Sequence, residues 1–195
     1  MSTVKSKKLQ VGTDASASNN FTIYQPSTPD GTLRIGVGNA DSPTEVGRFD
    51  SNGYVATKSP AFSAYLASNQ TVSPNGSTKV TFNTELFDTN SNFDSTTNYR
   101  FTPNVAGYYQ INFMLCFPTG ANNCISQLYK NGSLYLTGTR VDSSSTGFNS
   151  MVSDLVYFNG TTDYVEGYGY TSGTTFAGGA TGAVCRFSGF LVRAV

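Results

Sequence analysis

The chain of 195 residues is long enough for one all-β domain with an appendage or for two small domains, and its twelve basic and twelve acidic residues cancel. Charged residues make up 12% of the chain, about half the usual share, so the composition gives no indication of binding to nucleic acid or to an anionic membrane. The chain has no histidine, which removes the commonest general base and the commonest metal ligand.

The first residues, MSTVKSKKLQVG, carry positive charge but lack the apolar stretch of a secretory signal. No run in the sequence is long and apolar enough to span a membrane, so we expect synthesis in a cytosol and no membrane insertion. Lys5, Lys7 and Lys8 meet no acidic residue before Asp14. They fit either a solvated chain end or an arm that docks on an acidic partner surface.

Residues 1–59 contain short β-like pieces, FTIYQ, TLRIGVG and VGRFDSNGYVA, separated by the turn-forming stretches PSTPDG, GNADSP and DSNG. The pieces are too short to enclose a core, so we predict small hairpins that pack on another copy or on a partner. FDSNGYV predicts one hairpin with Asn52 and Gly53 at its tip. We interpret residues 1–59 as an attachment region. Its candidate contact residues are Lys5, Lys7, Lys8, Phe21, Ile23, Leu33 and Ile35.

Residues 60–195 contain longer alternating runs. KVTFNTELF predicts one face formed by Val80, Phe82, Thr84 and Leu86. YYQINFMLCF predicts one face formed by Tyr109, Ile111, Phe113, Leu115 and Phe117. Asn131-Gly132 and Asn159-Gly160 each predict a hairpin between flanking strands. Helical spacing is missing, and about eight to ten strands with turn signals between them predict an all-β sandwich or jelly roll.

Several motifs in residues 60–195 resemble, in order and spacing, the C1q/TNF-like jelly rolls. PAFSAYL looks like the opening strand of a C1q head, and FTPNVAGYYQINF resembles the F-x-x-x-x-x-G-x-Y-x-F segment of that family. Phe101, Gly107, Tyr109 and Ile111 hold the signature places, with Ile111 where phenylalanine is usual. LYKNG resembles the family's Asn-Gly hairpin, and FSGFL resembles its last strand.

The resemblance implies a homotrimer in which one sheet of each subunit lies near the three-fold axis. YVEGYGY places tyrosines on one face of a strand, and RFSGFLVRAV carries apolar residues on both faces. The candidate trimer interface comprises Tyr164, Tyr168, Tyr170, Phe190 and Val192. The alternative for the tyrosines is an exposed face without a partner. Gly189 predicts close packing against its strand.

Cys116, Cys124 and Cys185 are an odd number without metal-ligand spacing, so we expect small buried residues; a bridge between Cys116 and Cys124 stays open. Acidic residues are scattered through turn-like stretches, and no pair is marked as the two carboxylates of a glycosidase. The glycine-rich segments are not followed by a helix, so they do not predict a phosphate site. We therefore expect no enzyme and no cofactor. Calcium at a trimer apex stays open, with Asp142, Asp154 or Asp163 as possible ligands.

LRIGVGN, then VGRFDSNGYV, then a C1q-like head resembles accessory structural proteins of tailed bacteriophages. This implies a protein of the virion whose residues 1–59 attach three chains to a major capsid protein or a tail protein. A trimeric fibre shaft needs many residues to span distance, so the short chain favours capsid decoration, or cement, over a tail fibre or spike tip. A host-surface glycan is a further possible ligand in either role. A glycan-processing enzyme is the distant alternative.

Overall fold

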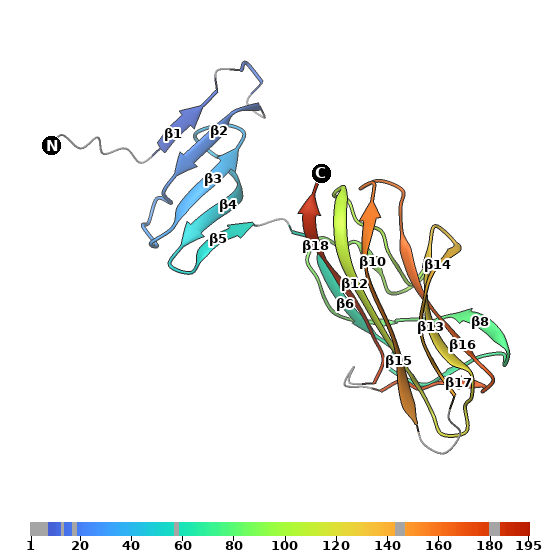
Figure 1. The fold of residues 1–195 in the computed structure, drawn as a ribbon. Helices are drawn as coiled ribbons and strands as arrows, with labels where there is room; N and C mark the ends of the chain where they lie inside the picture. Colours follow the sequence, from blue (N-terminus) through green and yellow to red (C-terminus); the bar gives the residue numbers. More distant parts are fainter. Residues whose placement is uncertain (1–7, 13, 17–18, 57–58, 143–146, 180–183) are drawn as a thin grey trace. The chain divides into compact units, whose positions relative to one another are not determined.

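The computed structural model describes residues 8–12, 14–16, 19–56, 59–142, 147–179 and 184–195 (Figure 1). Nearly all of its regular structure is antiparallel β-strand, which confirms the predicted all-β class. The chain divides into two compact units, residues 1–59 and 60–195, called here the N-terminal unit and the head. None of the described residues forms a helix with the length and apolarity needed to cross a bilayer.

The N-terminal unit is a five-stranded meander in which each strand pairs with the next one along the chain (Figure 1). Its strands are β1 (Lys8–Val11), β2 (Phe21–Tyr24), β3 (Leu33–Val37), β4 (Thr44–Asp50) and β5 (Gly53–Ala56). The hairpin predicted from FDSNGYV joins β4 to β5, but its tip lies one residue earlier than predicted, at Ser51 and Asn52. The reason is that Gly53, at a φ of 116°, already pairs with Asp50.

The head contains two larger sheets and one small sheet. Its strands are β6 (Ala61–Tyr65), β7 (Gln70–Thr71), β8 (Gly76–Lys79), β9 (Thr84–Asp88), β10 (Phe93–Asp94), β11 (Arg100–Phe101), β12 (Gly107–Phe117), β13 (Cys124–Lys130), β14 (Ser133–Val141), β15 (Phe148–Phe158), β16 (Val165–Thr171), β17 (Thr175–Phe176) and β18 (Arg186–Ala194). The first head sheet has the order β10-β11-β16-β13-β14, with β8 also paired to β16. The second head sheet has the order β15-β12-β18-β6-β9, and β17 pairs with β7.

An aromatic core fills the space between the two head sheets. The face of β12 predicted to be apolar is at most 1% exposed throughout, so its alternation is confirmed. Phe187 of β18 lies in the centre, with its ring centroid 5.1 Å from that of Phe62 and 5.9 Å from that of Phe113. Such offset and edge-on ring pairs stabilise a core beyond their buried area.

The predicted Asn131-Gly132 hairpin is confirmed. It joins β13 to β14 through a tight turn in which Asn131 has a φ of 53° and Gly132 a φ of 78°. Two successive residues with positive φ match the twist of the flanking strands, which is why Asn-Gly favours this turn.

The hairpin predicted at Asn159-Gly160 is wrong. The two flanking strands, β15 and β16, belong to different sheets, so the segment crosses from one sheet to the other. The side-chain Oδ1 of Asn159 accepts hydrogen bonds from the backbone N–H groups of Thr161 and Thr162, both at 2.9 Å. These bonds fold the connection on itself in place of a two-residue hairpin turn.

The run KVTFNTELF was expected to form one strand with one buried face, and this is only partly correct. Val80 and Phe82 are fully buried, but Leu86 is 48% exposed. The strand is interrupted between β8 and β9, which belong to different sheets, and the pairing of β6 with β9 shifts register beside Leu86. The alternation therefore restarts before Leu86.

All three cysteines are free, so the bridge left open between Cys116 and Cys124 does not form. Cys124 and Cys185 are fully buried. Burial raises the pKa of Cys185 to about 12, and its thiol donates to the carbonyl oxygen of Ala177 at 2.7 Å. These thiols are structural residues with little nucleophilic character.

Candidate interaction surfaces

The second head sheet presents an open apolar face on the side away from the core. Strands β9, β12, β15 and β18 contribute large side chains that are between 41% and 56% exposed. These residues are Phe87, Tyr108, Met151, Leu155, Tyr157, Phe190 and Val192. Several large apolar side chains exposed on one sheet face of a folded domain indicate a site of interaction. We call these seven residues the open face.

The registers of β12 with its two neighbours, β15 and β18, place open-face residues of these three strands beside one another. Tyr108 pairs with Tyr157, and their ring centroids are 5.5 Å apart. Gln110 lies between Leu155 on one side and Phe190 on the other. A short polar strip crosses the same face, where the Nε2 of Gln110 donates to Ser153 Oγ at 2.9 Å. Because the strip is hydrogen-bonded within the sheet, it can be covered by a partner at little cost.

The predicted trimer-interface residues do not lie on one surface. Phe190 and Val192 lie on the open face, 49% and 53% exposed. Tyr168 and Tyr170 lie on β16, and Tyr164 directly precedes it, so the three tyrosines belong to the first head sheet. The core separates the two sheets, so one flat contact cannot include both groups.

The three tyrosines are half-buried, and at least two of them pack against their own subunit. The ring of Tyr168 stacks on that of Tyr129 with centroids 3.9 Å apart. The guanidinium of Arg100 lies 4.1 Å from the centroid of the Tyr164 ring. Between them, the buried carboxylate of Glu166 forms an ion pair with Lys79. The tyrosines at positions 164 and 168 are thus held by contacts within their own subunit.

The N-terminal unit has a second apolar surface. The register aligns Leu9 with Ile23 and Ile23 with Ile35 across β1, β2 and β3, and it aligns Leu33 with Phe49 across β3 and β4. Cross-strand partners share a face of a sheet. We call this surface the apolar face of the N-terminal unit. Its exposed members, 36% to 59% exposed, are Leu9, Val11, Phe21, Ile23, Leu33 and Phe49.

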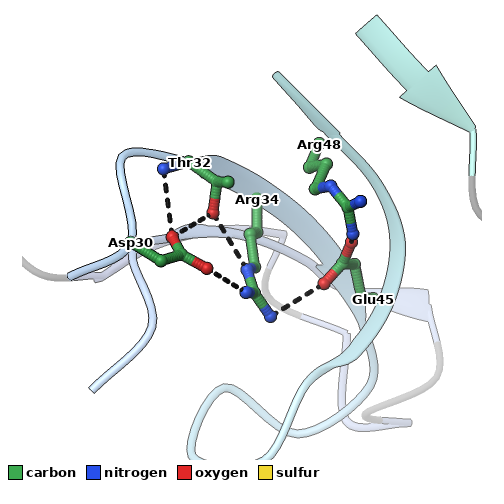
Figure 2. Close-up of polar contacts among 5 residues, drawn as sticks. All are labelled: Asp30, Thr32, Arg34, Glu45 and Arg48. Carbon is green, nitrogen blue, oxygen red and sulfur yellow. Dashed lines mark hydrogen bonds and ion pairs between the residues drawn. The ribbon is translucent and has the colours of Figure 1, made fainter. Parts of the chain in front are cut away.

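The opposite surface of the N-terminal unit is polar, and ion pairs between side chains connect its strands and loops, as Figure 2 shows. Arg34 on β3 forms ion pairs with Asp30 at 2.5 Å and with Glu45 on β4 at 3.0 Å. Glu45 also pairs with Arg48 at 3.4 Å. A hydrogen bond from the side chain of Thr32, together with Arg34, lowers the pKa of Asp30 to about 2. We call this surface the polar face of the N-terminal unit.

The predicted attachment residues therefore divide between the two faces. Phe21, Ile23 and Leu33 are exposed on the apolar face, and Ile35 is half-buried on the same face. Lys8 forms an ion pair with Asp41 at 3.6 Å. The other two predicted lysines, Lys5 and Lys7, lie outside the described residues.

Three acidic residues of the head, Asp94, Asp142 and Asp163, form hydrogen bonds or ion pairs within the subunit. Backbone N–H groups of Thr97 and Thr96 donate to the Asp94 carboxylate and hold its pKa well below the usual range. Asp163 pairs with Lys130 at 3.1 Å, and Asp142 pairs with Arg140 at 2.9 Å. In the part of the chain that the structure describes, no group of three or more acidic, cysteine or histidine side chains could hold a metal ion.

The two stacked antiparallel sheets of the head have the C1q/TNF-like jelly-roll fold. The chain is similar to the globular domain of zebrafish complement 1qA protein, with 20% identity and a TM-score of 0.56 over 71% of this chain and 100% of that one. It is also similar to Eiger TNF from S. frugiperda, with 8% identity and a TM-score of 0.52 over 70% of this chain and 93% of that one. At such identities the likeness shows the fold alone. No protein-family profile and no curated protein sequence matches the chain.

Sequence reasoning missed most of the open face. In the run SMVSDLVYF, the residues Met151, Leu155 and Tyr157 alternate with the buried Val152, Val156 and Phe158. A strand that is apolar on both faces indicates cover on both faces. That signal was present in the sequence, as were Leu9, Val11 and Phe49 on the apolar face of the N-terminal unit.

Proposed function

We propose that the protein is a non-catalytic structural knob whose head forms a homotrimer through the open face of the second head sheet. The carrying observation is the open face itself, whose seven large side chains are between 41% and 56% exposed in the single subunit. Covering apolar surface yields about 25 cal/mol per Å², and interfaces of permanent homo-oligomers are more apolar than the rest of a protein surface. The C1q/TNF-like fold supports the same arrangement, since the resemblance implies a trimer.

Phe190 and Val192 belong to this proposed interface, together with Tyr108, Leu155 and Tyr157. Tyr164, Tyr168 and Tyr170 are not part of it, because they lie on the other head sheet. In this arrangement the tyrosine surface faces away from the sister subunits and is available to another partner.

We further propose that the trimer is a component of a phage particle and that residues 1–59 attach it there. The support is the order of the chain, a small sheet with exposed apolar residues followed by a C1q/TNF-like head. Capsid decoration, or cement, is the favoured role because the unit directly before the head is a single small meander and not an elongated shaft. The carboxylates of Asp94, Asp142 and Asp163 are held in loop hydrogen bonds or ion pairs, which favours a binding role over hydrolysis of glycans.

The head trimer is tested with a shortened chain that starts at Pro60. Light scattering should give three times the subunit mass, and Phe190→Asp should give a folded monomer because it places a charge in the apolar contact. Tyr170→Asp, on the opposite sheet, is the matched control and should remain a trimer. A shortened chain that is monomeric at micromolar concentration would sink the proposed interface.

Attachment and location are tested on particles. The full chain should bind particles that lack it, and the shortened chain should not. Electron microscopy of labelled protein then separates the roles, because decoration gives many copies over the shell and a fibre or spike gives a few copies at the tail. Tail labelling together with binding to host-surface glycan would favour the alternative role. Attachment of the shortened chain would exclude residues 1–59 as the anchor.

A further inference from the structure

The two faces of the N-terminal unit have the reverse of the usual pattern of burial. On the apolar face, Leu9 is 59% and Val11 is 56% exposed. On the polar face, Thr22 is fully buried, and the side chains of Glu45 and Arg34 are only 17% and 26% exposed. The polar face is thus partly covered by the unit itself, whereas the apolar face is exposed to solvent.

Local packing explains how the polar face is covered. A side chain added at Gly36, which is itself buried, would lie 2.7 Å from the Cβ of Pro43 and 3.1 Å from the ring of Tyr24. The loop before β4 and the aromatic ring therefore lie over the polar side of β3. The ion pairs of Arg34 with Asp30 and Glu45 cross the same surface (Figure 2). The loop before β4 thus covers the polar side of the sheet. The described residues of the unit place no second layer on the apolar side.

A single sheet with one bare apolar face is not stable by itself. Stable domains bury each apolar sheet face against another layer, and isolated small sheets are marginal in water. Because the apolar face extends over β1 to β4, its cover must be about as wide as the sheet. The unit thus needs an apolar partner surface of its own size from the time it folds.

We propose that this partner is the same face of other copies of the chain: the N-terminal units of three chains pack apolar face to apolar face into a shared core, with the polar faces outward. Three flat faces around a three-fold axis form a closed triangular prism. This inference rests on the proposed trimer of the head, which brings three copies together.

Charge favours a second copy as the occupant. Among the described residues, the apolar face contains no charged side chain, so copies meet without repulsion. The charged residues that the structure describes in this unit lie on the polar face and in loops, as the network of Arg34, Glu45 and Arg48 illustrates. A surface this apolar is typical of permanent contacts between identical subunits, and contacts made later with a separate partner are more polar.

Tethering favours the same occupant. Only residues 57–60 lie between the end of β5 and the start of β6, and each residue spans at most about 3.5 Å. A head trimer therefore holds three N-terminal units close together, at an effective concentration in the millimolar range for short linkers. A particle protein would meet the face only after assembly, whereas sister copies are present as soon as the trimer forms.

The inference changes the role of the predicted attachment residues. Phe21, Ile23, Leu33 and Ile35 would hold three chains together instead of contacting the particle. Contact with the particle would then fall to polar residues on the outward side of the unit, such as Arg48, whose side chain is 37% exposed.

Cysteine labelling of the full chain tests the inference with two neighbouring positions on one strand. Leu9→Cys places a thiol on the apolar face, and Gln10→Cys places one on the opposite face; both positions are exposed in the single chain. The reaction rate with a maleimide is measured for each variant, and the labelling of the unmodified chain, whose Cys124 and Cys185 are buried, is subtracted. Light scattering of the same samples gives the subunit number.

The expected result is a trimer in which Leu9→Cys reacts at least about tenfold more slowly than Gln10→Cys. A trimer in which the two variants react at equal rates overturns this inference and leaves the proposed head trimer intact. A monomeric full chain overturns the proposed trimer and the inference with it. Slow labelling of Leu9→Cys that appears only after particles are added also overturns the inference, because the occupant is then a particle protein.

Discussion

At the scale of single residues, two phenylalanines of β18 that are three positions apart have different roles. Phe187 is fully buried at the centre of the aromatic core, and Phe190 is 49% exposed on the open face. The alternation of the strand separates them by three positions, which places their side chains on opposite sides of the sheet. The same type of side chain therefore stabilises the subunit at one position and, in our proposal, the trimer at the other.

The first prediction compares these two residues in the shortened chain starting at Pro60. Loss of a buried phenylalanine costs about 3–5 kcal/mol, and an unpaired carboxylate in its place costs more, which approaches the whole stability of a domain. Phe187→Asp should therefore unfold the subunit, and Phe190→Asp should give a folded monomer. Circular dichroism in the aromatic region and light scattering measure both outcomes. Two folded trimers would show that β18 does not have the role assigned to it.

The second prediction concerns Asp30, whose pKa is lowered from 3.8 to about 2 by the hydrogen bond from Thr32 and by Arg34. A carboxylate with a depressed pKa stabilises the folded state above its unfolded pKa, and this contribution is lost as the pH falls. The N-terminal unit should thus lose stability as the pH falls from about 4 to 2, and Asp30→Asn should remove part of that dependence.

Amide signals of β3, followed by NMR across this pH range, measure the acid transition. Asp41→Asn is the control, because the Asp41 side chain is 97% exposed and pairs only loosely with Lys8, at 3.6 Å. An acid transition that is identical in Asp30→Asn and in the unmodified chain would contradict the role given to Asp30.

At the scale of strands, β18 fits the head because one of its positions has no side chain. A Cβ added at Gly189 would lie 2.7 Å from the Cδ1 of Ile111 and 3.0 Å from both the Gln110 carbonyl oxygen and the ring of Phe62. The neighbouring strands β12 and β6 therefore pack closely over this position, as the sequence predicted. Close packing here lets the aromatic rings on both sides meet in the core.

The third prediction uses glycine replacements of matched size. Gly189→Ala should lower the free energy of unfolding by about 1–3 kcal/mol, since overpacking of a core costs that much. Gly76→Ala, in β8, is the control, because an added Cβ there meets nothing within 4 Å; it should be neutral or slightly stabilising. Urea unfolding at equal protein concentration compares the two. Equal stabilities would mean that β12 and β6 give way without cost.

Alternation within a strand was predictable from the sequence, but membership of a sheet was not. The buried face of β12 follows from its period of two, which depends only on neighbouring residues. The tyrosines of β16 and the apolar residues of β18 were combined in one predicted interface because each alternates, and alternation does not say which sheet a strand joins. The wrong hairpin prediction after β15 has the same cause. An Asn-Gly pair predicts a turn, but long-range packing decides whether the two strands that flank the turn pair with each other.

At the scale of the whole molecule, each of the two units leaves one apolar sheet face exposed. The head has its open face, and the N-terminal unit has its apolar face. In our two proposals, a single copy is therefore incomplete in both units. We expect folding and assembly to be coupled, so that the stability of one chain depends on the presence of others.

The fourth prediction follows from that coupling. The melting temperature of the shortened chain should rise by about 3 °C for each tenfold increase in protein concentration, because dissociation accompanies unfolding. The same chain with Phe190→Asp should melt at a temperature that does not change with concentration. Differential scanning calorimetry at several concentrations makes the comparison. A concentration-independent melting temperature in the unmodified shortened chain would contradict assembly through the open face.

The chemical character of the open face also has a consequence for cooling. Phe190, Leu155 and Met151 are hydrocarbon-rich side chains, and association through them is driven by release of water from apolar surface. This driving force weakens as water is cooled. The affinity between subunits joined in this way would be higher at body temperature than in an ice bath. Sulfate salts would raise that affinity, whereas sodium chloride would change it little. Refrigeration would then be the condition under which the knob comes apart most readily.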